Sequence, residues 1–358
     1  MSLPEPVPPG GGGAEFLTEI REQPQALRAL LEHERDYARV ATKARERGAT
    51  TVRMVGHGSS DNATSYGVYA FGLLPRWTAL RDSIALTAYY DAGLDMSGST
   101  VIALSQSGRT PDVIDYLGRA RKAGGYTVAL TNDISSDLAG EAEEVLPLAA
   151  GPERAVAASK TYLNQIAALG LFAAYAAGEG RQFADGIRAT ADLLEELMPT
   201  LEPRVRTVAL SFASVGRMFV VGRGIEFATA REIALKLLET CRVAAEPLTA
   251  TALQHGPVAA LDPLFPVWTI ASDDETLPAV VQAAERVHAV GAALVASGDA
   301  ADRLVGAAYS LPVPKPPVPL LSPLLSVVPG QLFAAALARA RGLDPDHPVG
   351  LSKVTLAR

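Results

Sequence analysis

Short β-branched apolar runs alternate with longer segments of helical period along most of the chain. In the first half, the pattern predicts strands at 52–56, 101–105, 126–131 and 144–148. It predicts helices there at 61–73, 110–123 and 158–177. Alternation of strands with helices is typical of a parallel sheet that is covered by helices on both faces. The chain is therefore predicted to be an α/β protein.

The two halves of the chain resemble each other at a constant offset of about 166 residues. The matching segments are Val52–Ser60 with Met218–Glu226, Val101–Ser105 with Val267–Ala271, and Tyr126–Thr131 with Ala292–Ser297. An offset of this length indicates a duplicated domain and not a short solenoid repeat.

The repeat and the helical pattern predict six consecutive regions along the chain. They are a disordered Pro- and Gly-rich tail at 1–14, an N-terminal helix at 15–47, a first domain at 48–180, a linker helix at 181–210, a second domain at 211–341 and a C-terminal tail at 342–358. The N-terminal tail lacks the apolar core of a signal peptide. Two apolar runs, 161–178 and 318–338, are short or interrupted by Pro and polar residues, so we expect core helices and no membrane partner.

Composition narrows the possible partners and the location. Of the 358 residues, 48% are hydrophobic and 20% charged, which excludes a largely disordered chain. The net charge of −7 leaves no basic surplus for a nucleic acid partner. The single cysteine, Cys241, cannot form an intramolecular disulfide, and we expect a cytoplasmic protein. No His, Cys, Asp or Glu cluster has metal-ligand spacing, so no metal is expected.

The segment Ser105–Asp112 is the strongest candidate for a binding loop because it directly follows a predicted strand. Thr110 suits the N-cap of the next helix and Pro111 its first turn, so free N–H groups and hydroxyls converge there. The pattern fits a phosphate cradle without lysine, or else an ordinary Ser-rich turn. The corresponding segment of the second half, Ser272–Thr276, contains three carboxylates, which would repel phosphate.

Three further features carry possible chemistry. Gly56-His57-Gly58 follows a strand, but Asp61 stands where a dinucleotide-binding loop needs its third glycine, which favours a ligand contact from Ser60 instead. Glu232, Lys236 and Glu239 share one helix face, either as an exposed ion-pair ladder or as a buried proton shuttle. His255 precedes Gly-Pro in a turn and is a candidate acid or base.

Together these motifs resemble the sugar isomerase (SIS) domain family over about residues 15–358. Within it, they are most similar to the deaminases of glucosamine 6-phosphate and to the isomerase half of glutamine–fructose-6-phosphate aminotransferase. The segments that carry the resemblance are 19–24, 56–61, 105–110, 155–160, 222–224, 232–236, 255–257 and 350–353. The resemblance implies two tandem SIS domains, each a flavodoxin-like three-layer sandwich with a parallel sheet.

The resemblance also implies roles for individual residues. Binding of the phosphate is assigned to Ser105, Gln106, Ser107 and Thr110, and contact with the sugar to Ser60 and Ser159. Glu239 is assigned proton transfer between C1 and C2, and Lys236 the stabilisation of charge in the intermediate. His255 is assigned ring opening, and Lys353 contact with the open-chain sugar. His255 would come from a neighbouring subunit, which implies a homodimer with a shared site. Ala158-Ser159-Lys160 and Gln254 depart from the aminotransferase pattern.

The expected reaction converts glucosamine 6-phosphate and water into fructose 6-phosphate and ammonia, without a cofactor. The chain starts Met1-Ser2, and Cys241 lies in a predicted helix, so we expect no glutamine-hydrolysing nucleophile. The alternatives are an aminotransferase-type subunit that works with a separate glutaminase, or a deaminase of a galactosamine or fructosamine phosphate. A non-catalytic sugar-phosphate regulator is a third, although no basic recognition helix precedes Thr50.

Overall fold

The computed structural model describes residues 12–353, so most of the predicted tail at 1–14 lies outside the described residues. The chain divides into two compact units. The N-terminal unit comprises Gln23–Pro152 and Lys160–Ala191. The C-terminal unit comprises the described residues up to Glu22, Glu153–Ser159 and Asp192–Lys353.

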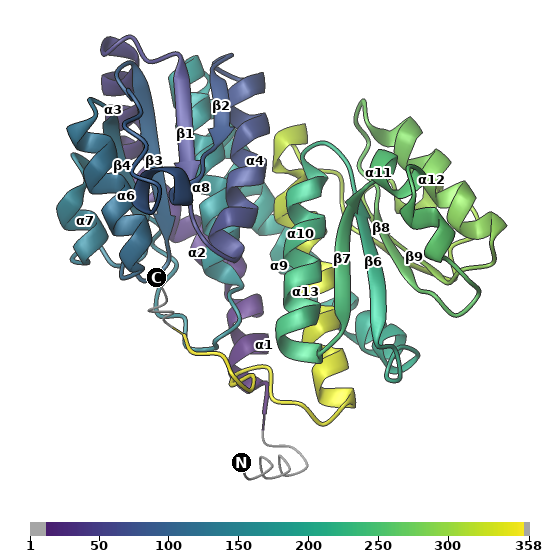
Figure 1. Ribbon diagram of the computed structural model, residues 1–358. Coiled ribbons are helices and arrows are strands. Elements are labelled where there is room, and N and C mark those ends of the chain that lie inside the picture. The colour runs from purple at the N-terminus through teal and green to yellow at the C-terminus, as the bar shows by residue number, and fades with distance from the viewer. Residues whose placement is uncertain (1–11, 354–358) are drawn as a thin grey trace. The chain divides into compact units, whose positions relative to one another are not determined.

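The N-terminal unit is built on a five-stranded parallel sheet of order β2-β1-β3-β4-β5. The strands are β1 (Thr51–Val55), β2 (Thr78–Arg81), β3 (Ser99–Ser105), β4 (Tyr126–Thr131) and β5 (Glu144–Pro147). One face is covered by α2 (Gln23–Leu31), α3 (Glu34–Glu46), α4 (Ser59–Leu73) and α8 (Lys160–Ala177), and the other by α5 (Ile84–Ala88), α6 (Pro111–Lys122) and α7 (Asp137–Glu141) (Figure 1). Every residue of β3 and β4 is buried, because helices lie on both sides of them.

The C-terminal unit repeats this arrangement, with strand order β7-β6-β8-β9-β10 and all strands parallel. Its strands are β6 (Arg217–Gly222), β7 (Ala244–Thr249), β8 (Val267–Ile270), β9 (Leu294–Gly298) and β10 (Tyr309–Pro312). One face is covered by α10 (Glu226–Cys241) and α13 (Ser322–Ala340), and the other by α11 (Ala250–Gln254) and α12 (Leu277–Ala289) (Figure 1). Short 3-10 helices lie at Pro257–Ala260, Ala301–Arg303 and Pro319–Leu321. The predicted α/β fold, with two copies of one sheet topology, is confirmed.

Two parts of the chain differ from the sequence-based prediction. The region 15–47, which was expected to be one helix, forms α1 (Ala14–Arg21), α2 and α3. Pro24 explains the first break, because proline fits only the first turn of a helix, and α2 starts at Gln23. The edge strand β2 was not predicted, because three of its four residues are exposed and it has no apolar run. The long helix α9 (Gly180–Leu210) matches the helix predicted at 181–210.

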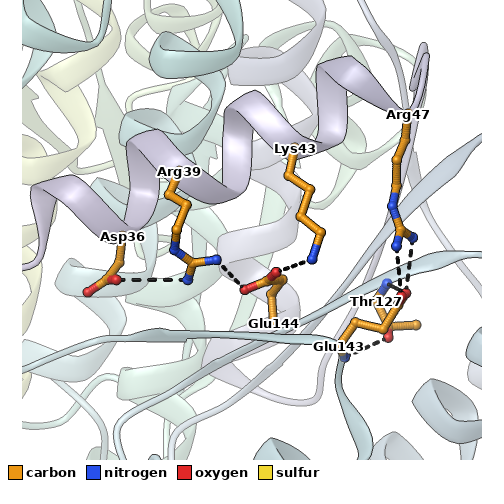
Figure 2. Close-up of polar contacts among 7 residues, drawn as sticks. All are labelled: Asp36, Arg39, Lys43, Arg47, Thr127, Glu143 and Glu144. Carbon is orange, nitrogen blue, oxygen red and sulfur yellow. Dashed lines mark hydrogen bonds and ion pairs between the residues drawn. The ribbon is translucent and has the colours of Figure 1, made fainter.

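Helix α3 is fixed to the sheet of the N-terminal unit by a row of charged contacts (Figure 2). Glu144 on β5 accepts from Arg39 and Lys43, each at 2.6 Å. Burial opposes ionisation of this carboxyl, but the two cationic donors hold the pKa of Glu144 below its usual value. One turn further on, Arg47 binds Glu143, whose backbone N–H donates to the Thr127 hydroxyl on β4. The positively charged face of α3 thus follows the β5 edge of the sheet.

One helix among residues 12–353 is long and apolar enough to cross a membrane by length and composition alone. This helical stretch, Pro319–Ala340, has a mean hydropathy of 1.7, and 94% of its most apolar window is buried. Helix α13 within it packs along α10 and against β9. It is therefore a core helix of the C-terminal unit and not a membrane span.

Candidate functional site

The candidate phosphate loop lies where the strand order of the N-terminal sheet reverses. Strand β1 pairs with β2 on one side and with β3 on the other, and the chain moves outward from this point in both directions. Loops after the two central strands flank a crevice at such a point, which is where open α/β sheets bind ligands. The loop after β1 contains His57, and the loop after β3 is Gln106–Thr110 (Figure 1).

The candidate phosphate loop is ordered by its own hydroxyls. Ser105 Oγ accepts from the backbone N–H of Gly108 at 3.1 Å and lies 3.2 Å from Thr110 Oγ1. Ser107 Oγ accepts from the N–H of Arg109 at 3.3 Å. Gly108 has a φ of +64°, and a Cβ there would lie 1.9 Å from Ser136 Oγ, so only glycine fits.

The remaining parts of this loop agree with an anion site. Thr110 is the N-cap of α6 and Pro111 its first residue, as predicted, so the free N–H groups of the first turn point toward the loop. The carbonyl of Gln106 accepts from the N–H of Asn132, which ties the loop to the end of β4. The hydroxyls of Ser105, Ser107 and Thr110 thus lie in a loop that ends at a helix N-terminus and has no lysine.

Ser60 lies in the first turn of α4, which follows the loop after β1. It is 8% exposed, and its hydroxyl accepts from Gln165 Nε2 on α8 at 2.8 Å. A Cβ on Gly56 would lie 2.8 Å from the Ser60 Cβ and 3.1 Å from the Leu104 carbonyl oxygen. The first glycine of Gly-x-Gly is therefore explained by close packing of α4 on β3, and it gives no support to dinucleotide binding.

The corresponding position of the C-terminal unit is filled by a buried carboxylate. Glu226 replaces Ser60 at the repeat offset and is 1% exposed. Its oxygens accept from four hydroxyls at 2.5–2.7 Å, those of Thr229, Ser272, Ser322 and Ser326. Burial raises the pKa of Glu226 above its ordinary value, although these hydrogen bonds oppose the shift. The second copy thus has a buried acidic group at the position of Ser60.

A buried acid–base cluster lies on α10. Lys236 Nζ donates to Glu239 Oε2 at 2.6 Å and lies 3.5 Å from Glu232 Oε1. The side chains of Lys236 and Glu232 are 1% and 0% exposed, so these residues are not a solvated ion-pair ladder. Burial alone would lower the pKa of Lys236, but the charges of Glu239 and Glu232 raise it. Glu239 is 23% exposed and is the carboxylate of this cluster that reaches solvent.

The predicted tail lysine is held beside a second buried acid. Lys353 Nζ donates to Glu153 Oε2 and to the carbonyl oxygen of Ala155, both at 2.7 Å. Glu153 also accepts from the backbone N–H of Ser159, and its charge contributes to the raised pKa of Lys236. Sequence reasoning missed Glu153. The only feature of the sequence that could have indicated its role is its position just before the segment 155–160.

The remaining predicted site residues differ in their exposure. His255 is exposed at the end of α11, and no hydrogen bond or ion pair joins its side chain to another side chain within residues 12–353. Ser159 is fully buried. Burial raises the pKa of Cys241 to about 11, and its thiol donates to the carbonyl oxygen of Ala334. No group of three or more His, Cys, Asp or Glu within the described part of the chain is arranged to hold a metal ion.

Comparisons with known proteins bear on the family and the fold of this chain. A model of the SIS domain family matches residues 82–175 and 211–339. The glutamine–fructose-6-phosphate aminotransferase of Corynebacterium glutamicum is 32% identical over 367 residues, which cover 96% of this chain and 58% of that protein. The chain thus spans less than two thirds of the length of the curated relatives it matches.

Solved structures show the same fold. A candidate phosphosugar isomerase from Silicibacter pomeroyi DSS-3 is 33% identical, with a TM-score of 0.82, and the match covers 93% of this chain and 99% of that one. Glucosamine-6-phosphate deaminase from Thermotoga maritima has a TM-score of 0.79 at 21% identity, covering 96% of this chain and 100% of that one. At that identity the likeness shows the fold alone.

Proposed function

The chain belongs to the SIS domain family of phosphosugar isomerase-like proteins, and we propose that it deaminates an amino-sugar phosphate, with glucosamine 6-phosphate as the substrate. The observation that carries the proposal is the Lys236–Glu239 pair, a buried ammonium beside a solvent-reachable carboxylate. Such a pair suits proton transfer at a carbon next to a carbonyl group.

Glu239 would act as the general base and then as the acid. In the open-chain sugar, its carboxylate removes the proton from C2, which carries the amine, and returns that proton to C1. Negative charge develops on the C1 oxygen in the intermediate, and the Lys236 ammonium, held charged by two carboxylates, would stabilise it. The C1 oxygen takes up a proton and the nitrogen loses one, which leaves a hydroxyl group at C1 and an imine at C2. Addition of water and loss of ammonia then give fructose 6-phosphate.

The phosphate would be bound by the loop of the N-terminal unit. Ser105, Ser107 and Thr110 provide hydroxyls, Gln106 an amide, and α6 its N-terminal N–H groups. Hydroxyls and backbone amides bind phosphate through directed hydrogen bonds, so an acidic chain can still recognise an anion locally. Ser60 would contact the sugar, and we keep Ser159 as a candidate for the same role.

Lys353 and His255 complete the proposed set of residues. Lys353 would leave Glu153 to contact the open-chain sugar, and His255 would assist ring opening from the neighbouring subunit of a homodimer. The exposure of His255 and its lack of a side-chain partner among the described residues are compatible with this role. Sedimentation analysis would detect the dimer. Mixing Glu239→Gln with His255→Ala chains should restore part of the activity, because one of the two sites would then be intact.

The assay that tests the proposed reaction measures ammonia release from three substrates: the 6-phosphates of glucosamine, galactosamine and N-acetylglucosamine. We expect ammonia and fructose 6-phosphate in equal amounts from glucosamine 6-phosphate. The 32% identity to an aminotransferase supports a second candidate, amination of fructose 6-phosphate by glutamine. A parallel reaction with glutamine, with and without an added glutaminase, tests it. Tight sugar-phosphate binding with no turnover of any substrate would favour a regulator and contradict both enzymatic proposals.

A further inference from the structure

His57 and Asp112 form a pair that the proposed function does not use. His57 Nε2 lies 2.8 Å from Asp112 Oδ2, and the imidazole is 56% exposed while the carboxylate is 10% exposed. His57 belongs to the loop after β1, and Asp112 is the second residue of α6, two residues beyond the N-cap Thr110. The pair therefore joins the loop after β1 to the first turn of α6, which follows the loop after β3.

The backbone of His57 is fixed by helix α4. Its carbonyl oxygen accepts from the N–H of Ser60 at 3.0 Å and of Asp61 at 3.4 Å, two residues before α4 begins at Ser59. The contact with Asp112 fixes the tilt of the imidazole, because one ring nitrogen is engaged with the carboxylate.

The environment of Asp112 argues against a purely structural ion pair. Its second oxygen, Oδ1, is buried and has no hydrogen-bond partner among the described residues. A buried carboxylate oxygen without a donor is costly. A negative charge in the first turn of α6 would also compete with a phosphate for the positive end of that helix. The His57 ring contacts the other oxygen of this carboxylate at 2.8 Å.

The internal duplicate provides a control for this argument. At the repeat offset, the positions of His57 and Asp112 are occupied by Arg223 and Pro278. Arg223 instead donates to Thr251, and Glu226 is buried at the position of Ser60. A pair needed only to hold the β-loop-α scaffold would be expected in both copies. It is present only in the copy whose loop is compatible with phosphate.

We infer that His57, oriented by Asp112, is a further phosphate-binding residue of the N-terminal unit and directs its Nδ1–H to a phosphate monoester. Asp112 is a positioning residue, since it acts through the ring. The ring would add a hydrogen-bond donor to a loop that has no lysine. This inference rests on the proposed phosphate-binding role of the loop.

The test measures binding of inorganic phosphate to the full chain by calorimetry. We expect His57→Ala to weaken binding roughly tenfold to hundredfold, the usual effect of losing a charged hydrogen bond. His347→Ala is the matched control, because His347 is also an exposed histidine near an aspartate, 3.4 Å from Asp344. It should bind as the unmodified chain does. Circular dichroism verifies that both variants are folded.

The role of Asp112 needs a readout that stability alone would not change. In ¹⁵N spectra of the imidazole, the unmodified chain should show His57 protonated at Nε2, and Asp112→Asn should change this signature while the chain remains folded. An unchanged signature would contradict the positioning role.

A third variant separates this inference from the proposed function. Ser107→Ala should weaken phosphate binding if the loop binds phosphate at all. If Ser107→Ala weakens binding and His57→Ala does not, the inference is wrong and the loop assignment stands. If the unmodified chain does not bind phosphate, or if neither variant changes binding, the loop assignment fails and the inference fails with it.

Discussion

Replacement of Lys236 by methionine should destabilise the C-terminal unit strongly. Methionine keeps most of the side-chain volume but removes the ammonium that lies 2.6 Å from Glu239 and 3.5 Å from Glu232. Glu232 is 0% exposed, so its negative charge would remain buried without this cation. Loss of one partner of a buried ion pair costs about 3–5 kcal/mol of unfolding free energy.

The chain offers both a specific probe and a matched control. Its two tryptophans are Trp77, in the N-terminal unit, and Trp268, buried in β8 of the C-terminal unit. In a Trp77→Phe background, urea unfolding followed by tryptophan fluorescence therefore reports on the C-terminal unit alone. Lys315→Met removes an exposed ion pair with Asp273 from the same unit and should cost less than about 1 kcal/mol.

A second substitution tests the cause of the loss. Glu232→Gln added to Lys236→Met removes the Glu232 charge that Lys236 no longer neutralises. The double variant should recover part of the stability, since the two residues belong to one network. If Lys236→Met and Lys315→Met cost the same small amount, the α10 cluster is not the buried, coupled group that its geometry indicates.

Three further predictions concern other parts of the chain. Gly108→Ala should abolish phosphate binding in the calorimetric assay, because the added Cβ would collide with Ser136. Gly140→Ala in α7 is the control and should leave binding intact, because its Cβ would have no atom within 4 Å. The pKa of Glu226 is higher in the folded than in the unfolded chain, so the folded state binds more protons. The contribution of Glu226 to the free energy of unfolding is therefore greatest below its unfolded pKa, and it declines as the pH rises through the folded pKa. Urea unfolding at several pH values should show that Glu226→Gln lacks this decline, and an identical pH dependence in both proteins would contradict the shift. Cys241, with a pKa of about 11, should resist alkylation by iodoacetamide at pH 8 in the native chain and should react after unfolding. Mass spectrometry would measure the labelling, and rapid labelling of the native chain would contradict the burial of this thiol.

Local features of the fold could be predicted from the sequence because neighbouring residues determine them. The apolar run of β3, the Thr110 cap and Pro111 specify a strand, a turn and a helix start within a dozen residues. The constant offset between the halves predicted a repeated topology, and both sheets have the same strand order. Edge strand β2 was missed because its exposed residues leave no apolar pattern.

Features that depend on distant contacts could not be predicted in this way. The helical spacing of Glu232, Lys236 and Glu239 fits either an exposed or a buried face, and it is the packing of α10 against α13 and the sheet that buries two of the three. Glu153 meets Lys353 across 200 positions of sequence. The hydroxyls around Glu226 come from three separate segments, so no local pattern could have indicated that this carboxylate is buried.

The central claim is that Glu239 moves the proton between C2 and C1 of an amino-sugar phosphate. The most direct measurement compares ammonia release from glucosamine 6-phosphate by the unmodified chain and by Glu239→Gln, with phosphate binding measured in parallel. We predict that the variant loses turnover by at least about 10²–10⁴-fold, the usual contribution of a general base, while phosphate binding stays within about twofold. Full ammonia release by Glu239→Gln would contradict the assignment.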